Sequence, residues 1–142
     1  MKRNTSGRSL AVKLGLHAKV EKEVPFEWTI AKFNPALPAV LSTPAMIGMM
    51  EVAASHALRP ALPPGAISVG TRIEVDHLKA VSAGARVTAS AKLTRKKGRF
   101  LVFDVEARSG RHVIGRGKVF RAIVEPNSFS AKAGSRAKSE KH

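Results

Sequence analysis

The chain has 142 residues, of which 44% are hydrophobic and 25% are charged, and it carries a formal net charge of +15. This length suits one domain that buries about two-thirds of the surface of its unfolded chain. The absence of cysteine excludes disulfides, thiolate nucleophiles and zinc–cysteine sites, and it favours a reducing compartment. No apolar run of signal-peptide length follows the basic N-terminus, and no stretch approaches the roughly 20 apolar residues of a membrane span. A cytoplasmic protein without a membrane partner is therefore predicted.

Much of the positive charge lies near the two ends of the chain. Residues 1–19 hold five basic residues and no acid, and residues 128–142 hold four basic residues and Glu140. Both stretches are rich in small and polar residues that offer little apolar surface to bury, so basic flexible segments are expected at 1–17 and 128–142, around a domain at 18–127. The remaining charge would suit a nucleic acid or a small polyanionic ligand, and charge alone does not choose between them.

The first predicted element is a strand over residues 18–28. Apolar and charged side chains alternate there, with Val20, Val24 and Phe26 on one side and Lys19, Glu21 and Glu23 on the other. Proline cannot donate to a sheet ladder, so Pro25 places this strand at an edge. Three prolines within residues 33–44 then predict an ordered loop.

A helix is predicted to begin at Ser42-Thr43-Pro44, where a hydroxyl N-cap is followed by proline at the first helical position. It runs to about Leu58, because Arg59-Pro60 ends it. Most of its circumference is apolar, through Ala45, Met46, Ile47, Met49, Met50, Val52, Ala53, Ala54 and Ala57. Such a helix is usually buried.

Four further strands are predicted near residues 67–79, 85–95, 99–108 and 112–125, separated by the turn-like Gly84, Lys97-Gly98 and Ser109-Gly110. A strand, a helix and then four strands joined largely by hairpins indicate an α+β domain with an antiparallel sheet. We expect one central, mostly apolar helix that is wrapped by a strongly curved five-stranded antiparallel sheet.

Several familiar sites are absent from the sequence. It has no Gly-x-Ser-x-Gly elbow and no Walker loop, and the Gly115-x-Gly117 pattern has Phe120 where a dinucleotide fingerprint needs a third glycine. The histidines show no metal-ligand spacing with one another or with carboxylates. Neither a metal nor another cofactor is expected.

Three polar side chains remain as candidates, and each has an ordinary structural interpretation. His77 continues the face of the strand that holds Ile67, Val69, Thr71, Ile73 and Val75, so it points toward the helix, where it could be a hydrogen-bonded core histidine. Glu51 is the only acid of the helix, and with Ser55 and Arg59 at i, i+4 spacings it could belong to a solvated stripe. Thr43 could simply be an N-cap.

Together, these three side chains are a hydroxyl, a carboxylate and an imidazole, the groups that activate a nucleophile and shuttle a proton. Sequence spacing does not show that they meet. Three separated motifs, Leu41 to Glu51, Pro64 to Thr71 and Val75 to His77, resemble the fluoroacetyl-CoA thioesterase family of hotdog proteins. Gly84, Gly98-Arg99 and Ile114 to Gly117 continue the resemblance, which covers roughly residues 20–130.

The resemblance implies a homodimer of hotdog subunits that hydrolyses a short or medium acyl-CoA to the acid and coenzyme A. The family's catalytic residues fall on Thr43, Glu51 and His77. The sequence leaves open whether Glu51 or Thr43 is the nucleophile. The glycine whose amide contacts the thioester falls on Gly70. An arginine that helps to bind coenzyme A falls on Arg121, and Arg116 is a further candidate for the phosphates.

The resemblance has one departure, in the loop before the helix. The enzyme that gives the family its name has a lid of phenylalanines there, whereas Asn34 and Leu37 hold the matching positions in this chain. Strong selectivity for a fluoroacetyl group is therefore not expected.

Two other classes of function stay open. A hotdog subunit could bind acyl-CoA without hydrolysing it. The basic tails could instead make the chain a nucleic-acid binder, but it has one Trp, no Tyr and no interleaving of aromatic with basic residues, so at most non-specific binding through the tails is expected.

Overall fold

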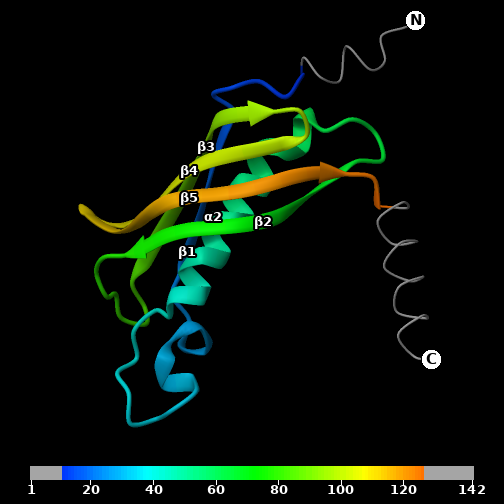
Figure 1. Cartoon of the computed structure of the whole chain (residues 1–142). Helices are drawn as coiled ribbons and strands as arrows, with labels where there is room; N and C mark the ends of the chain where they lie inside the picture. Colours follow the sequence, from blue (N-terminus) through cyan, green and yellow to red (C-terminus); the bar gives the residue numbers. More distant parts are fainter. Residues whose placement is uncertain (1–10, 127–142) are drawn as a thin grey trace, which may run out of the picture.

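The computed structural model describes residues 11–126, in which five antiparallel strands form one sheet and a single long helix lies against one of its faces (Figure 1). The strands are β1 (His17–Glu23), β2 (Ile67–His77), β3 (Arg86–Lys97), β4 (Phe100–Ser109) and β5 (His112–Val124). Their order in the sheet is β1-β3-β4-β5-β2. The four later strands lie within two residues of their predicted bounds, and the predicted architecture is confirmed.

Helix α2 (Thr43–Leu58) begins and ends where the sequence predicts, but its N-cap is Ser42. The Ser42 hydroxyl accepts a hydrogen bond from the backbone N–H of Ala45 at 3.2 Å. Pro44 occupies the first turn, where its missing N–H costs nothing. The interpretation of Thr43 as a plain N-cap is therefore wrong, because its neighbour performs that role.

The core lies between α2 and the inward row of β3 and β4. The predicted alternation in these strands is confirmed, because the inward side chains are at most 4% exposed, namely Val87, Ala89, Ala91, Leu93, Leu101, Phe103, Val105 and Ala107. Alanines in this row let the helix approach the sheet closely. The helix packs mainly on β1 and β3, so its contacts with β2 are fewer. Within residues 11–126, no helix is long and apolar enough to span a membrane.

The first strand is shorter than predicted. β1 ends at Glu23, opposite Arg86 at the start of β3, and two short 3-10 turns follow, η1 (Phe26–Trp28) and η2 (Ile30–Lys32). Pro25 precedes the first turn and cannot donate to a ladder, which explains the stop. The predicted edge position of β1 is confirmed.

The packed part of the chain begins earlier than the expected boundary at residue 17. Val12 is only 4% exposed and belongs to the core. Its carbonyl accepts a hydrogen bond from Lys96 Nζ at 2.9 Å, and the N–H of Gly15 donates to the carbonyl of Leu93 at 2.8 Å. Residues 11–17 therefore include a packed apolar side chain within a stretch whose average composition is polar. Residues 1–10 and the tail predicted at 128–142 lie outside the described residues.

Strand β2 contains an irregularity that the sequence did not reveal. Its register against β5 shifts between Gly70 and Arg72, so Thr71 is an extra residue in the ladder. Such a bulge reverses the alternation of side chains on either side of it. Ser68 and Gly70 therefore face α2, and Ile67, which was expected on that face, is 41% exposed.

Candidate active site

Thr43 and His77 meet directly. Thr43 is the first residue of α2 and His77 is the last residue of β2, and Thr43 Oγ1 lies 2.8 Å from His77 Nδ1. The Thr43 hydroxyl is available for this bond because Ser42 caps the helix. A hydroxyl hydrogen-bonded to an imidazole is the arrangement in which a proton moves between a nucleophile, or an orienting group, and a general base.

The second ring nitrogen of His77 differs from the first. Nε2 is buried and has no hydrogen-bond partner among residues 11–126. Buried polar atoms are nearly always paired in folded proteins, so Nε2 is available to pair with water or with a bound molecule. Nε2 is thus the nitrogen through which His77 can exchange a proton with a bound molecule.

Glu51 is part of an ion pair with the sheet. Its Oε1 accepts a hydrogen bond from Arg121 Nη1 at 2.9 Å, and its side chain is 32% exposed. Its cationic partner comes from β5 instead of the i+4 residue Ser55 or the i+8 residue Arg59 of the proposed solvated stripe. That stripe is therefore wrong as an account of Glu51.

Arg121 does not project into solvent. It is only 7% exposed, Nε donates to Ser68 Oγ at 3.0 Å, and Nη2 donates to the Ser68 carbonyl at 3.0 Å. With Nη1 bonded to Glu51, all three guanidinium nitrogens have a protein acceptor. The resemblance selected Arg121 but not Ser68, and nothing in the sequence distinguished the Ser68 hydroxyl from that of Thr71 in the same strand.

Gly70 allows the Glu51 carboxylate to lie against the backbone of β2. A Cβ at Gly70 would stand 2.8 and 2.9 Å from the two carboxylate oxygens, closer than real contacts of this kind. The side chain of Glu51 can therefore rest on Gly70 only because that residue has none. This places a carboxylate beside the backbone amide that the resemblance assigned to the thioester.

The two pairs lie on one side of α2. Eight residues separate Thr43 from Glu51, which is slightly more than two turns and about 12 Å along the axis. All side chains of a helix lean toward its N-terminus, so Thr43 and Glu51 lean the same way and keep about this separation. Their partners, Gly70 and His77, both lie on β2. The side chains of Thr43, Glu51 and His77 and the backbone of Gly70 therefore border one strip between α2 and β2.

The glycine pair in β5 supports this strip. Gly115 is paired with His77, and a Cβ there would meet Met46 Sδ at 2.5 Å. A Cβ at Gly117 would collide with the backbone carbonyl of Glu74. The Gly-x-Gly pattern thus serves close packing of β5 against α2 and β2.

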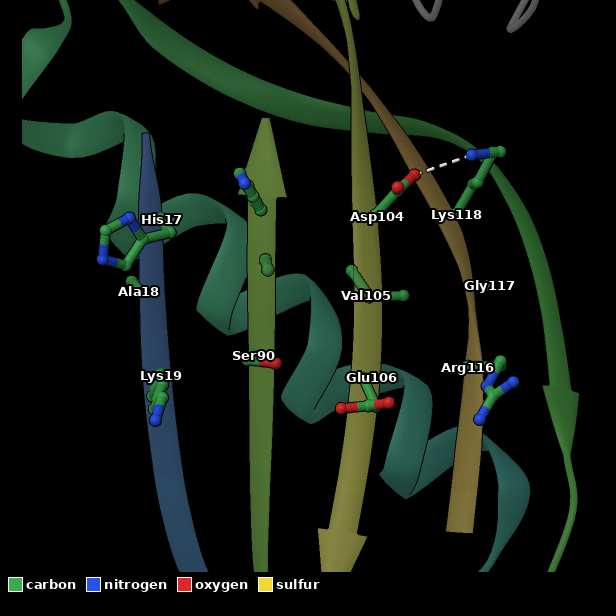
Figure 2. Close-up of a pocket in the computed structure, with 12 residues that line it drawn as sticks. His17, Ala18, Lys19, Ser90, Asp104, Val105, Glu106, Arg116, Gly117 and Lys118 are labelled. Carbon is green, nitrogen blue, oxygen red and sulfur yellow. Dashed lines mark hydrogen bonds and ion pairs between the residues drawn. The ribbon is translucent and has the colours of Figure 1, made fainter. Parts of the chain in front are cut away.

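Arg116 lies on the other face of the sheet. Figure 2 shows it beside Glu106 on the face turned away from α2, in a shallow hollow of about 590 Å³ that is also bordered by the ion pair of Lys118 with Asp104 at 2.6 Å. The sheet therefore separates Arg116 from Glu51. Within the described part of the chain, no three His, Asp or Glu residues gather in a way that could hold a metal ion.

Comparisons with known proteins point to one family. The model of the fluoroacetyl-CoA-specific thioesterase family matches residues 24–127. The fluoroacetyl-CoA thioesterase of Streptantibioticus cattleyicolor is 41% identical over 95 residues, which are 67% of this chain and 68% of that protein.

Solved structures agree with the sequence comparison. A structure of the fluoroacetyl-CoA thioesterase has a TM-score of 0.80 at 34% identity and covers 87% of this chain and 96% of its own. A thioesterase superfamily member from Thermus thermophilus has a TM-score of 0.84 at 25% identity, with 92% and 96% covered. A hot-dog-like protein from Thermanaerovibrio acidaminovorans has a TM-score of 0.83 at 26% identity, with 90% and 95% covered.

These relatives confirm the predicted hotdog fold and the predicted enzyme class, an acyl-CoA thioesterase. The family match spans most of the chain and includes Thr43, Glu51 and His77. The chain belongs to the fluoroacetyl-CoA-specific thioesterase family.

Proposed function

We propose that this thioesterase hydrolyses a short or medium acyl-CoA with Thr43, Glu51 and His77 as its catalytic side chains. The observation that carries the proposal is the 2.8 Å hydrogen bond between Thr43 Oγ1 and His77 Nδ1, beside a buried and unpaired Nε2. Because Ser42 already caps the helix, the Thr43 hydroxyl is not used as a cap and can bond to His77.

His77 handles the proton of the leaving group. When the Thr43 hydroxyl donates to Nδ1, the ring proton resides on Nε2. Nε2 gives this proton to the coenzyme A thiolate as the C–S bond breaks while Nδ1 takes the hydroxyl proton of Thr43, and a proton of the water consumed in the turnover restores that hydroxyl. Thr43 thereby fixes the tautomer and the orientation of the imidazole. The products are the carboxylic acid and the free thiol of coenzyme A.

Glu51 supplies the attack on the thioester carbonyl. It is the carboxylate that lies against Gly70, so a carbonyl whose oxygen is bound by the Gly70 amide would place its carbon within reach. The carboxylate either takes a proton from an attacking water or attacks the carbon itself and forms an anhydride that water then opens. An amide donor at the developing oxyanion contributes about 3 kcal/mol in other enzymes.

A single turnover in ¹⁸O-labelled water separates the two routes. Direct attack by water places the label in the product acid. Attack by Glu51 followed by opening of the anhydride at the enzyme carbonyl leaves the label on Glu51.

A basic hollow on the surface could bind the nucleotide end of coenzyme A. A hollow of about 370 Å³ is lined by Thr71, which follows Gly70 in β2, and by Arg95 and Lys97 from the hairpin of β3 and β4. Phe100 also lines it and is 52% exposed. Basic side chains beside an aromatic ring suit the phosphates and the adenine of a nucleotide.

We propose a homodimer that forms through β2. Among the described strands, β2 pairs only with β5, so its other edge is open over 11 residues. Ile67 and Leu78 near its two ends are 41% and 54% exposed. A long edge with apolar ends favours pairing with a second copy. Light scattering should show twice the 15.2 kDa of one chain, and a monomer at micromolar concentration would contradict the dimer.

The proposed substrate is a short or medium acyl-CoA without strong selectivity for a fluoroacetyl group. The proposed location is the cytoplasm. Asn34 and Leu37 are exposed, and the neighbouring Phe33 is 81% exposed. A hydrophobic pocket distinguishes one small substituent by about 1–3 kcal/mol. The ratio of kcat/KM for fluoroacetyl-CoA over acetyl-CoA should therefore stay below a few hundredfold, and a preference of several thousandfold would contradict this assignment.

A thiol-release assay over a panel of acyl-CoA chain lengths tests the proposed function. Turnover that is lost in folded His77→Ala protein supports it. Calorimetric binding of acyl-CoA without turnover would instead support a non-catalytic acyl-CoA-binding protein.

A further inference from the structure

Among residues 11–126, Ser68 is the one residue that forms two hydrogen bonds with the Arg121 guanidinium. Its hydroxyl accepts from Nε and its carbonyl accepts from Nη2, both at 3.0 Å. The third nitrogen, Nη1, donates to Glu51 at 2.9 Å. Ser68 thus holds one edge of the planar group, and the opposite corner meets the carboxylate.

This geometry has a physical consequence for Arg121. The guanidinium is a permanent cation, and a buried cation is tolerated only when it is paired and fully hydrogen-bonded. Because the group is flat and its donors are fixed in a fork, two bonds on one edge determine where the remaining donors point. Ser68 therefore sets the direction in which Nη1 meets Glu51.

The pair of Arg121 with Glu51 differs from the other ion pairs of the described sheet. Its arginine side chain is 8% exposed, whereas Lys118 and Asp104 are 44% and 53% exposed. Exposed pairs contribute little, whereas charge-assisted bonds from a buried guanidinium to a carboxylate are short and directional. Arg121 also borders the hollow that Arg95 and Lys97 line, but each of its three guanidinium nitrogens already donates to a protein acceptor.

We propose that Ser68 is a positioning residue for catalysis, which acts by holding Arg121 so that Arg121 fixes the Glu51 carboxylate against Gly70. The inference rests on the proposed function, because it assigns Glu51 the attack on the thioester. It gives Arg121 the task of orienting Glu51 and leaves the phosphates of coenzyme A to other basic side chains.

The kinetic test compares Ser68→Ala with wild type on acetyl-CoA and on S-acetyl-pantetheine, which has no phosphates. Ser68, Arg121 and Glu51 form one hydrogen-bonded unit. Loss of the Ser68 hydroxyl bond from this unit should lower kcat about tenfold on both substrates with little change in KM. Ser68→Thr keeps the hydroxyl and should recover most of the rate. Ser90→Ala, a change on the outer row of β3, is the matched control and should leave kcat unchanged.

Two kinetic outcomes would overturn the proposal. One is a wild-type kcat in folded Ser68→Ala protein. The other is a rise in KM for acetyl-CoA alone, because that result would mean that the unit acts on the phosphates. If Ser68→Ala does not fold, Ser68→Cys has nearly the same shape and a weak acceptor, and the same outcomes apply to it.

A second readout does not need turnover. Urea unfolding gives the free energy of unfolding of Ser68→Ala, Glu51→Gln and the double variant. If both side chains act through Arg121, the changes in this free energy for the two single variants should not sum to the change in the double variant. Additive shifts would overturn the inference. If wild type hydrolyses neither thioester, the proposed function fails, and this cycle alone decides whether Ser68 and Glu51 are coupled.

Discussion

Glu51→Gln is the substitution whose consequences follow most directly from the geometry. It removes the negative charge that faces Arg121 and keeps the shape of the side chain and an oxygen that can accept from Nη1. Breaking a fully buried ion pair costs about 3–5 kcal/mol. Because Glu51 is 32% exposed and the amide still accepts one hydrogen bond, the free energy of unfolding should fall by only about 1–2 kcal/mol.

The effect of Glu51→Gln on the rate should be larger than its effect on stability. An amide neither attacks a thioester nor accepts a proton from water, so kcat should fall by about a hundredfold or more. Circular dichroism and urea unfolding establish that the variant is folded, and thiol release gives kcat. A folded Glu51→Gln protein with a kcat close to wild type would refute this reasoning.

Asp104→Asn is the matched control for this experiment. It removes a carboxylate from an ion pair of the same sheet, with Lys118, on the face away from α2. Since both side chains are about half exposed, the loss of stability should stay below about 1 kcal/mol. The value of kcat should not change.

Three further comparisons have distinct expected outcomes. Thr43→Ala should lower kcat at least tenfold with little loss of stability, whereas Ser42→Ala should cost about 1 kcal/mol in urea unfolding, and the reverse pattern would mean that Thr43 is structural. Val12→Ala should cost about 1–2 kcal/mol because that side chain is 4% exposed, while Leu14→Ala, at 62% exposure, should be nearly silent; equal effects would contradict the packing of residues 11–17. Lys97→Glu should raise KM for acetyl-CoA several-fold and leave S-acetyl-pantetheine unaffected, and an equal rise for both substrates would contradict the nucleotide site.

The sequence predicted the helix and the later strands because each has a clear period. The apolar circumference of residues 43–58 and the alternation in β3 and β4 reflect burial directly. The first strand failed at Pro25, where alternation continued in the sequence although the ladder could not. Val12 was missed because a single apolar residue does not change the composition of a basic stretch.

The site was predictable only in part. The contact between Thr43 and His77 joins residues 34 apart in the sequence, so it depends on the whole fold. The residue types made both side chains candidates, and only the resemblance placed them in one site. Ser68 was missed for a definite reason. Strict alternation counted back from His77 places Ser68 on the outer face of the sheet. The bulge at Thr71 reverses the alternation for the residues before it, so Ser68 points inward toward Arg121. No local signal marked that bulge.

The most direct test of the central claim, that Glu51 and His77 belong to one catalytic unit, is the kcat of the double variant Glu51→Gln/His77→Ala beside the two single variants. Members of one unit are strongly non-additive, so each single change should lower kcat by about a hundredfold and the double variant should be scarcely slower than either. All three proteins should remain folded. Losses that multiply in the double variant, or single variants that keep wild-type rates, would contradict the account and place the chemistry elsewhere between α2 and β2.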